Sequence, residues 1–166
     1  MQDLHARFVE ILAAIERSGM GESIRTTPYL YPMLMSVHVL GIALLVGPAF
    51  VMDLRLLGLG RSVIPVSVAA RYLLPVSHAG FAVVFATGVA MFMAIALAVG
   101  GSPAAPWKFG LIAIAGVNIV IFHKGIYQHV GAWDIDVDPP MSAKVAAMVS
   151  AASWTGAVFG GRFLAY

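Results

Sequence analysis

Three histidines stand inside long apolar segments of this sequence, where an ionisable ring is unexpected. His38 lies within an uncharged run over residues 29–52, His78 follows an arginine at position 71, and His123 closes a third apolar run. Ionisable residues inside membrane-spanning segments are rare, face other helices or a cavity, and mark functional sites. Imidazole nitrogens bind haem iron and copper. All three histidines are therefore candidate ligands of a metal or a haem.

The depth of each ring predicts which histidines could act together. At a helical rise of ~1.5 Å per residue, His78 lies about 10 Å from the boundary at Arg71. His123 lies about 22 Å beyond Lys108, which is a similar depth in a hydrocarbon core ~30 Å thick. We therefore predict that His78 and His123 are the axial ligands of a haem b. A structural hydrogen bond is the alternative role for each ring.

His38 lies in the opposite half of the membrane, and two methionines are expected at its depth. They are Met91 and Met93, which lie near the end of the second apolar run. Histidine with methionine suits haem or copper. His38 with these methionines is therefore a second candidate site.

Other polar residues at the ends of the apolar runs could support such a site. Arg55 and Arg71 could bind haem propionates or lipid headgroups, since arginine suits bidentate carboxylate binding. Alternatively, Asp53 and Arg55 form a stop signal and anchor at the membrane boundary. Asn118 is expected to hydrogen-bond between helices.

The loop over residues 133–140 carries three alternating acidic residues, Asp134, Asp136 and Asp138. It lacks the glycine and the closing glutamate of a calcium-binding loop. We expect a solvated acidic turn.

The composition requires that these residues be positioned by membrane helices. The chain has 166 residues, of which 60% are hydrophobic and 11% charged, whereas soluble domains average about 25% charged residues. Apolar runs of membrane-spanning length occupy residues 29–52, 72–99, 106–123 and 141–161. Short connections favour an up-down-up-down order. The fold class predicted for residues 29–166 is an all-α integral membrane four-helix bundle.

Residues 1–28 differ from the rest of the chain. Leu4, Phe8, Ile11 and Ile15 recur at steps of three and four, and charged residues mostly occupy the other faces. This pattern predicts an amphipathic helix on the membrane surface or on a partner protein, and a short soluble extension helix is the alternative.

Several classes of function are excluded by composition. The absence of cysteine rules out disulfides, thiolate metal sites, iron–sulfur clusters and covalent haem attachment. A net charge of +2 without a basic run argues against nucleic acid binding. No hydrolytic or phosphate-binding motif is present, and whether the protein is an enzyme stays open.

One sequence pattern resembles a family of small bacterial four-helix inner-membrane proteins. It comprises Tyr31–Pro32, His38, Gly41, Gly47 and the block DLRLLG at 53–58, with Asn118 and His123 further on. His78 is not part of that pattern. The resemblance implies a four-helix membrane bundle and names no activity. The fold and intramembrane histidines are also loosely similar to those of copper-resistance membrane proteins and small cytochrome b bundles.

The leading hypothesis is a membrane haem b protein that exchanges electrons with a quinone or a periplasmic partner. Two alternatives are an accessory or anchoring subunit of a larger membrane complex, and copper handling. The partners predicted are the lipid bilayer and other membrane subunits or further copies of this chain. The resemblance implies the bacterial inner membrane, and the three arginines of the first loop favour an orientation with both termini outside, in the periplasm.

Overall fold

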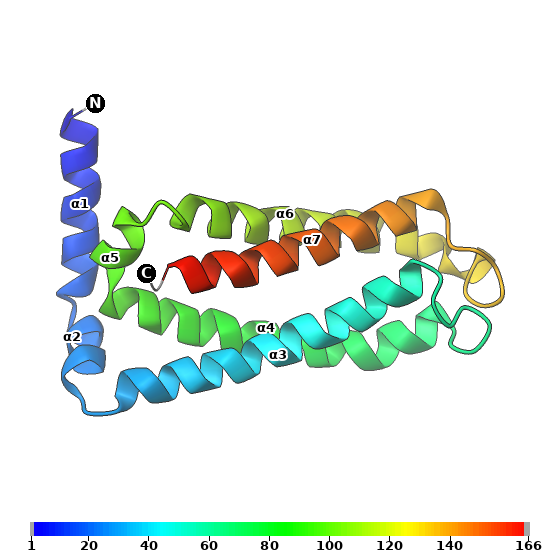
Figure 1. The fold of residues 1–166 in the computed structure, drawn as a ribbon, viewed down its shortest axis with the longest axis horizontal. Coiled ribbons are helices and arrows are strands. Elements are labelled where there is room, and N and C mark those ends of the chain that lie inside the picture. Colours follow the sequence, from blue (N-terminus) through cyan, green and yellow to red (C-terminus); the bar gives the residue numbers. More distant parts are fainter. Residues whose placement is uncertain (1, 165–166) are drawn as a thin grey trace.

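The computed structural model describes residues 2–164, and this part of the chain is all-helical (Figure 1). The elements are α1 (Gln2–Glu16), α2 (Gly19–Thr26), α3 (Leu30–Leu56), α4 (Val66–Ala94), α5 (Ala96–Gly101), α6 (Ala105–Lys124), the 3-10 helix η1 (Ile126–Ala132) and α7 (Met141–Phe163). The N-terminal region contains two helices rather than the single one predicted. The second apolar run breaks at Ile95 instead of continuing to position 99.

Among the described residues, three helices are long and apolar enough to cross a membrane: α3, α4 and α6. The protein is therefore membrane-embedded. Helix α7 is of similar length, with 23 residues, but it does not reach the same apolar character. Helix α7 also contains Lys144, Arg162 and several hydroxyl residues, which lower its mean hydropathy.

The four longest helices run lengthwise beside one another (Figure 1). Helix α3 packs along α4, α6 packs along α7, and contact between α3 and α7 joins the two pairs. Helices α4 and α6 make almost no contact over the described residues. The arrangement is therefore open on one side, between α4 and α6.

Glycines allow the closest helix contacts. A methyl group added at Gly80 of α4 would collide with the backbone of Leu44 and Leu45 in α3. In α7, Gly156 lies against the Leu111 side chain and Gly160 lies against Lys108 of α6. Gly156 and Gly160 form a GxxxG pair, a pattern that allows two membrane helices to approach closely.

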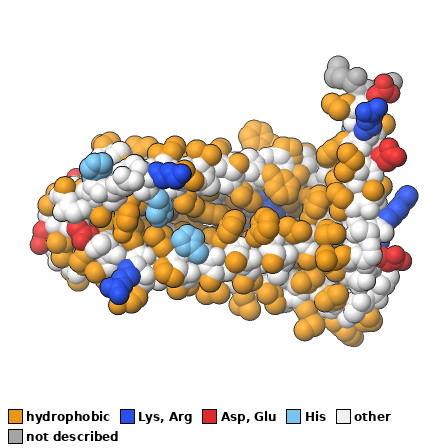
Figure 2. All heavy atoms as spheres, turned by 180° about the vertical axis from the view of Figure 1, so that it is seen from behind, with side chains coloured by type: hydrophobic (Ala, Val, Ile, Leu, Met, Phe, Trp, Pro, Cys, Tyr) orange, Lys and Arg blue, Asp and Glu red, His pale blue; other side chains and the backbone are white. Residues whose placement is uncertain are grey.

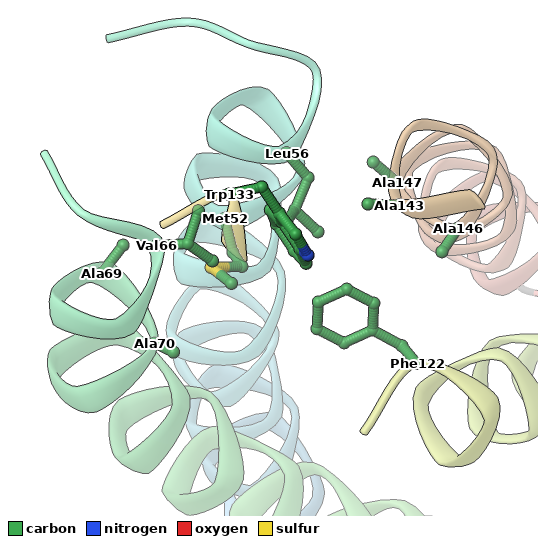
Figure 3. Packing of buried hydrophobic residues seen from close by; sticks show 10 residues of the cluster. All are labelled: Met52, Leu56, Val66, Ala69, Ala70, Phe122, Trp133, Ala143, Ala146 and Ala147. Carbon is green, nitrogen blue, oxygen red and sulfur yellow. The ribbon is translucent and has the colours of Figure 1, made fainter. Parts of the chain in front are cut away.

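A tryptophan from the last loop anchors the end of the molecule opposite the chain termini. Trp133 is buried, and Figure 3 shows it beside Met52 and Val66, with Phe122 and the alanines of α7 across from it. These residues come from α3, α4, α6 and α7, so a single loop residue contacts all four helices through one apolar cluster.

Buried polar residues fasten the same loop to the helices. Arg55 Nε donates to the Ile64 carbonyl at 2.5 Å, and Nη2 donates to the Asp134 carbonyl at 2.8 Å. The Asp134 carboxylate accepts from the Ser67 backbone nitrogen and hydroxyl, both at 2.7 Å, which caps the first turn of α4.

One expectation about these polar residues is corrected and another stays a prediction. Arg55 is buried and bonded to backbone carbonyls, and its role with Asp53 as a stop signal and boundary anchor stays a prediction. Asp134 is not part of a freely solvated turn, because its carboxylate holds α4, whereas Asp136 and Asp138 are exposed. A buried loop needs such partners for its backbone, and the carbonyls at 64 and 134 obtain them from Arg55.

Candidate functional site

A cavity of about 320 Å³ lies between α3, α4, α6 and α7. Figure 2, seen from behind, shows histidine side chains beside a hollow between the upper and lower halves of the molecule. The gap between α4 and α6 lies on this face, so the cavity opens sideways, toward lipid in a membrane. Its walls are mostly apolar, and its polar lining residues are Asp53, Ser77, His78, Asn118, His123 and Ser150.

Asp53 is the most unusual group in the cavity wall. The residue is only 6% exposed, and its Oδ2 atom is buried without a hydrogen-bond partner. The Ser150 hydroxyl hydrogen-bonds to the carboxyl group from α7. No ion pair joins Asp53 to Arg55 in the part of the chain that the structure describes. A buried, unpartnered carboxyl oxygen is costly and calls for an explanation.

Most other polar atoms around the cavity already have partners. Ser77 donates its hydroxyl proton to the Leu45 carbonyl at 2.9 Å. Asn118 Nδ2 donates to the Ala146 carbonyl of α7 at 2.9 Å, which confirms its predicted bond between helices. The Asn118 amide oxygen is therefore the end of that side chain left for other contacts.

His78 and His123 both line this cavity, from the two helices that flank the opening. His123 Nδ1 hydrogen-bonds to the Ile119 carbonyl of its own helix at 2.9 Å, so its Nε2 is the nitrogen left for other partners. The His123 ring contacts the rings of Phe122 and Tyr127, with centroid distances of 5.4 and 5.8 Å, and these two rings also contact each other. His78 is exposed, at the mouth of the cavity. The structure thus brings together the two histidines that the sequence analysis paired.

The size of the cavity limits what it can enclose. An engineered protein cavity of about 150 Å³ accepts benzene, so 320 Å³ suits a group about twice that size. A haem macrocycle is several times larger than benzene. The two imidazoles are of the right chemical type for axial ligation, but most of a macrocycle would have to project between α4 and α6.

His38 lies away from this cavity and has a different partner. Its Nδ1 is 2.8 Å from Thr87 Oγ1, and that hydroxyl is 2.6 Å from the Val83 carbonyl. Gly88 gives the ring room, because a methyl group there would lie 3.3 Å from His38 Cε1. This is the structural hydrogen bond that the sequence analysis left as the alternative to ligation.

The remaining predicted site residues are dispersed. Met91 lies one turn beyond Thr87 on α4, and the Met93 backbone lies against Gly21 of α2. Arg71 is exposed, two turns before His78 on the same side of α4. Over the described residues, no group of three or more histidine or acidic side chains could hold a metal ion. Copper at His38 with the methionines stays a prediction.

Comparison with protein-family models, curated proteins and solved structures finds no match to this chain. The resemblance to the inner-membrane family therefore stays a prediction.

Sequence reasoning missed the residues that complete both polar sites. Thr87 is the partner of His38, and Ser150 is the partner of Asp53. Hydroxyl residues in apolar helices carry little signal, because they can bond to their own helix backbone. Asp53 did carry a signal, since it follows more than twenty uncharged residues, but it was interpreted as the end of the span rather than as part of its interior.

Proposed function

We propose that this protein binds the headgroup of a lipid-soluble quinone in the cavity between α3, α4, α6 and α7, as part of membrane electron transfer. The observation that carries the proposal is the Asp53 carboxyl, whose buried oxygen has no partner in a mostly apolar cavity open toward lipid. A quinol hydroxyl is a donor that would satisfy this oxygen. The isoprenoid tail would leave between α4 and α6.

The size and chemistry of a quinone headgroup agree with the cavity. A substituted quinone ring is about twice the size of benzene, which is the scale set by the 320 Å³ volume. Small-molecule sites are mainly apolar with a few placed polar groups. Asp53 would accept from a quinol hydroxyl, an imidazole N–H of His78 would donate to a quinone carbonyl, and Nε2 of His123 would accept from a quinol hydroxyl. Quinones exchange protons together with electrons, and these are the groups that could take part.

The proposal includes a fourth membrane crossing by α7. Helix α7 packs along α6 through Gly156 and Gly160, and both ends of the described chain lie at the same end of the molecule (Figure 1). Four crossings would give an up-down-up-down bundle with both termini on one side. We place the protein in the bacterial inner membrane, as the family resemblance implies, and the first-loop arginines favour an orientation with both termini in the periplasm.

Photolabelling with an azido-quinone in lipid vesicles tests the proposal. Label should attach to peptides that contain Phe81 or Phe122, which line the cavity, and excess unlabelled quinone should displace it. The reduced quinol should also displace the label, and Asp53→Asn should weaken that displacement, whereas the exposed Asp136→Asn should not. Labelling that is spread over the lipid-facing residues and not displaced by competitor would overturn the proposal.

A haem b held by His78 and His123 is the second candidate. It is favoured by the position of both rings beside the opening and by the free Nε2 of His123. Haem would supply one-electron transfer, and Arg71 would lie on the side of α4 where a propionate could reach it. An absorption spectrum of the purified protein, oxidised and then reduced with dithionite, tests it. Sharp reduced α and β bands that disappear in His123→Ala would establish this candidate, and a featureless spectrum would reject it.

A further inference from the structure

Helix α1 projects as an arm at one end of the molecule, roughly at right angles to the long helices (Figure 1). We propose that this arm lies in the plane of the membrane interface, with its Leu4–Phe8–Ile11 face inserted among lipid acyl chains. The proposal is independent of what the cavity binds.

The arm has two chemically distinct sides. Leu4 is 76% exposed, Phe8 48% and Ile11 59%, although their helical spacing places all three on one side. Asp3, Arg7 and Glu10 lie beside this face, on the side of the helix opposite Leu12, and Figure 2 shows charged side chains of the arm pointing away from the rest of the molecule. Leaving three large apolar side chains in water is unfavourable, at about 25 cal/mol per Å² of apolar surface. The apolar side is therefore expected to be buried against lipid or protein.

The packing of Leu12 fixes which way the apolar side turns. Leu12 is buried, and its side chain lies directly over Gly100 of α5. Phe8 is one turn before Leu12 and lies on a neighbouring part of the helix surface. The apolar side thus begins next to the contact with α5 and extends along one flank of the arm, and the charged side faces away from the bundle.

Hydrogen bonds of two charged residues, Arg25 and Glu16, hold α1 in this orientation. Arg25 Nη1 donates to the Glu16 carbonyl at 2.7 Å and to the Ala94 carbonyl at 3.1 Å. The Glu16 carboxylate accepts from the Leu97 backbone nitrogen at 2.9 Å. These hydrogen bonds join the end of α1 to the end of α4 and the start of α5. The arm is therefore fixed relative to the membrane helices.

The position of α1 relative to the exposed aromatic residues indicates that lipid contacts its apolar side. Tyr29 starts α3 and Trp107 lies in the first turn of α6, and both are strongly exposed at the same end of the molecule as the arm. Exposed tyrosine and tryptophan gather at membrane interfaces. The apolar side of the arm therefore continues the lipid-facing surface of the spans at the depth where amphipathic helices insert.

Site-directed spin labelling tests this inference, and the chain contains no cysteine that would interfere. Phe8→Cys, Ile11→Cys and Glu10→Cys would each be labelled in the full chain, reconstituted in phosphatidylcholine vesicles. We expect labels at positions 8 and 11 to be accessible to oxygen and protected from a water-soluble nickel complex. The label at position 10 should show the reverse.

Two other outcomes would overturn the inference. If all three labels are accessible to the nickel complex, the arm projects into water. If positions 8 and 11 are shielded from both reagents, the cover is protein, and spin–spin broadening would identify a second copy of this chain. Unchanged helicity by circular dichroism verifies that each labelled variant is folded.

Discussion

The side chains of His38 and Thr87 form a polar contact between α3 and α4, with His38 Nδ1 2.8 Å from Thr87 Oγ1. The threonine hydroxyl also lies 2.6 Å from the Val83 carbonyl, to which it donates its only proton. The imidazole must then donate its Nδ1 proton to the threonine oxygen. A neutral ring in this tautomer explains how a histidine is accommodated within an apolar helix.

Replacing Thr87 by valine should weaken the packing of α3 on α4. The variant keeps the shape of the side chain but removes the acceptor for His38 Nδ1. Hydrogen bonds between membrane helices contribute about 0.6 kcal/mol on average and up to about 1.7 kcal/mol. We expect a loss in that range, measured by unfolding in mixed detergent micelles, while Thr87→Ser should retain most of the stability. Equal losses in the two variants would show that the hydroxyl is not involved.

The two glycines at positions 80 and 47 should respond differently to alanine. A methyl group at Gly80 would collide with the α3 backbone at Leu44 and Leu45, whereas one at Gly47 has nothing within 4 Å. Overpacking typically costs about 1–3 kcal/mol. Gly80→Ala should therefore lower the free energy of unfolding by about that amount, and Gly47→Ala should leave it almost unchanged. A similar stability of both variants would mean that α3 and α4 are further apart than described here.

Arg55 should not be replaceable by lysine. Its Nε and Nη2 bond to carbonyls in two different loops, and a single ammonium cannot reproduce this planar arrangement. Losing one such bond costs about 1.5–3 kcal/mol. We expect Arg55→Lys to reduce stability by that amount and to speed hydrogen exchange at the Val66 and Ser67 amides. The exposed Arg61 provides the matched control, and Arg61→Lys should have a much smaller effect.

The pH dependence of the last loop follows from Asp138. Its pKa is held below the usual range, chiefly because the Lys144 ammonium donates a hydrogen bond to it, with a further contribution from Arg61. A lowered pKa means that this contribution to stability is complete above the pKa of the unfolded chain, about 3.9. It is lost as the pH falls through the lower folded value.

The native protein should therefore lose more stability than Asp138→Asn when the pH falls from 6 toward 3. The difference should be small, because the group is exposed and screened by solvent. Unfolding titrations of both proteins at a series of pH values measure it. A larger loss in the variant would reverse the sign and contradict the assignment.

The sequence predicted the helices well because a bilayer requires long apolar segments, and α3, α4 and α6 show them clearly. It also paired His78 with His123, since depth follows from the helical rise alone. It could not predict which face of a helix meets which neighbour. The contacts of Thr87 and Ser150, and the hydrogen bonds of Arg55 with the loops, depend on how each helix is rotated about its own axis.

The position of Asp53 at the end of the first apolar run also could not be interpreted from the sequence alone. A charged residue after an apolar run usually marks where a span leaves the membrane, and only the packing of α7 and Ser150 against α3 places this one inside. Trp133 was assigned to a polar loop for a similar reason. Its burial follows from the folding of that loop back onto four helices.

Fluorescence of Trp154 offers the most direct test of quinone binding, because this buried residue lines the cavity with Asp53. The reconstituted protein and its Trp154→Phe variant would be titrated with a short-chain ubiquinone analogue. We predict saturable quenching in the native protein that is lost in Trp154→Phe. The reduced quinol form should displace the quinone, and Asp53→Asn should weaken that displacement about tenfold, as expected for the loss of about 1.4 kcal/mol from the hydrogen bond of the quinol hydroxyl. Quenching that does not saturate and is the same in all three proteins would contradict a quinone site in this cavity.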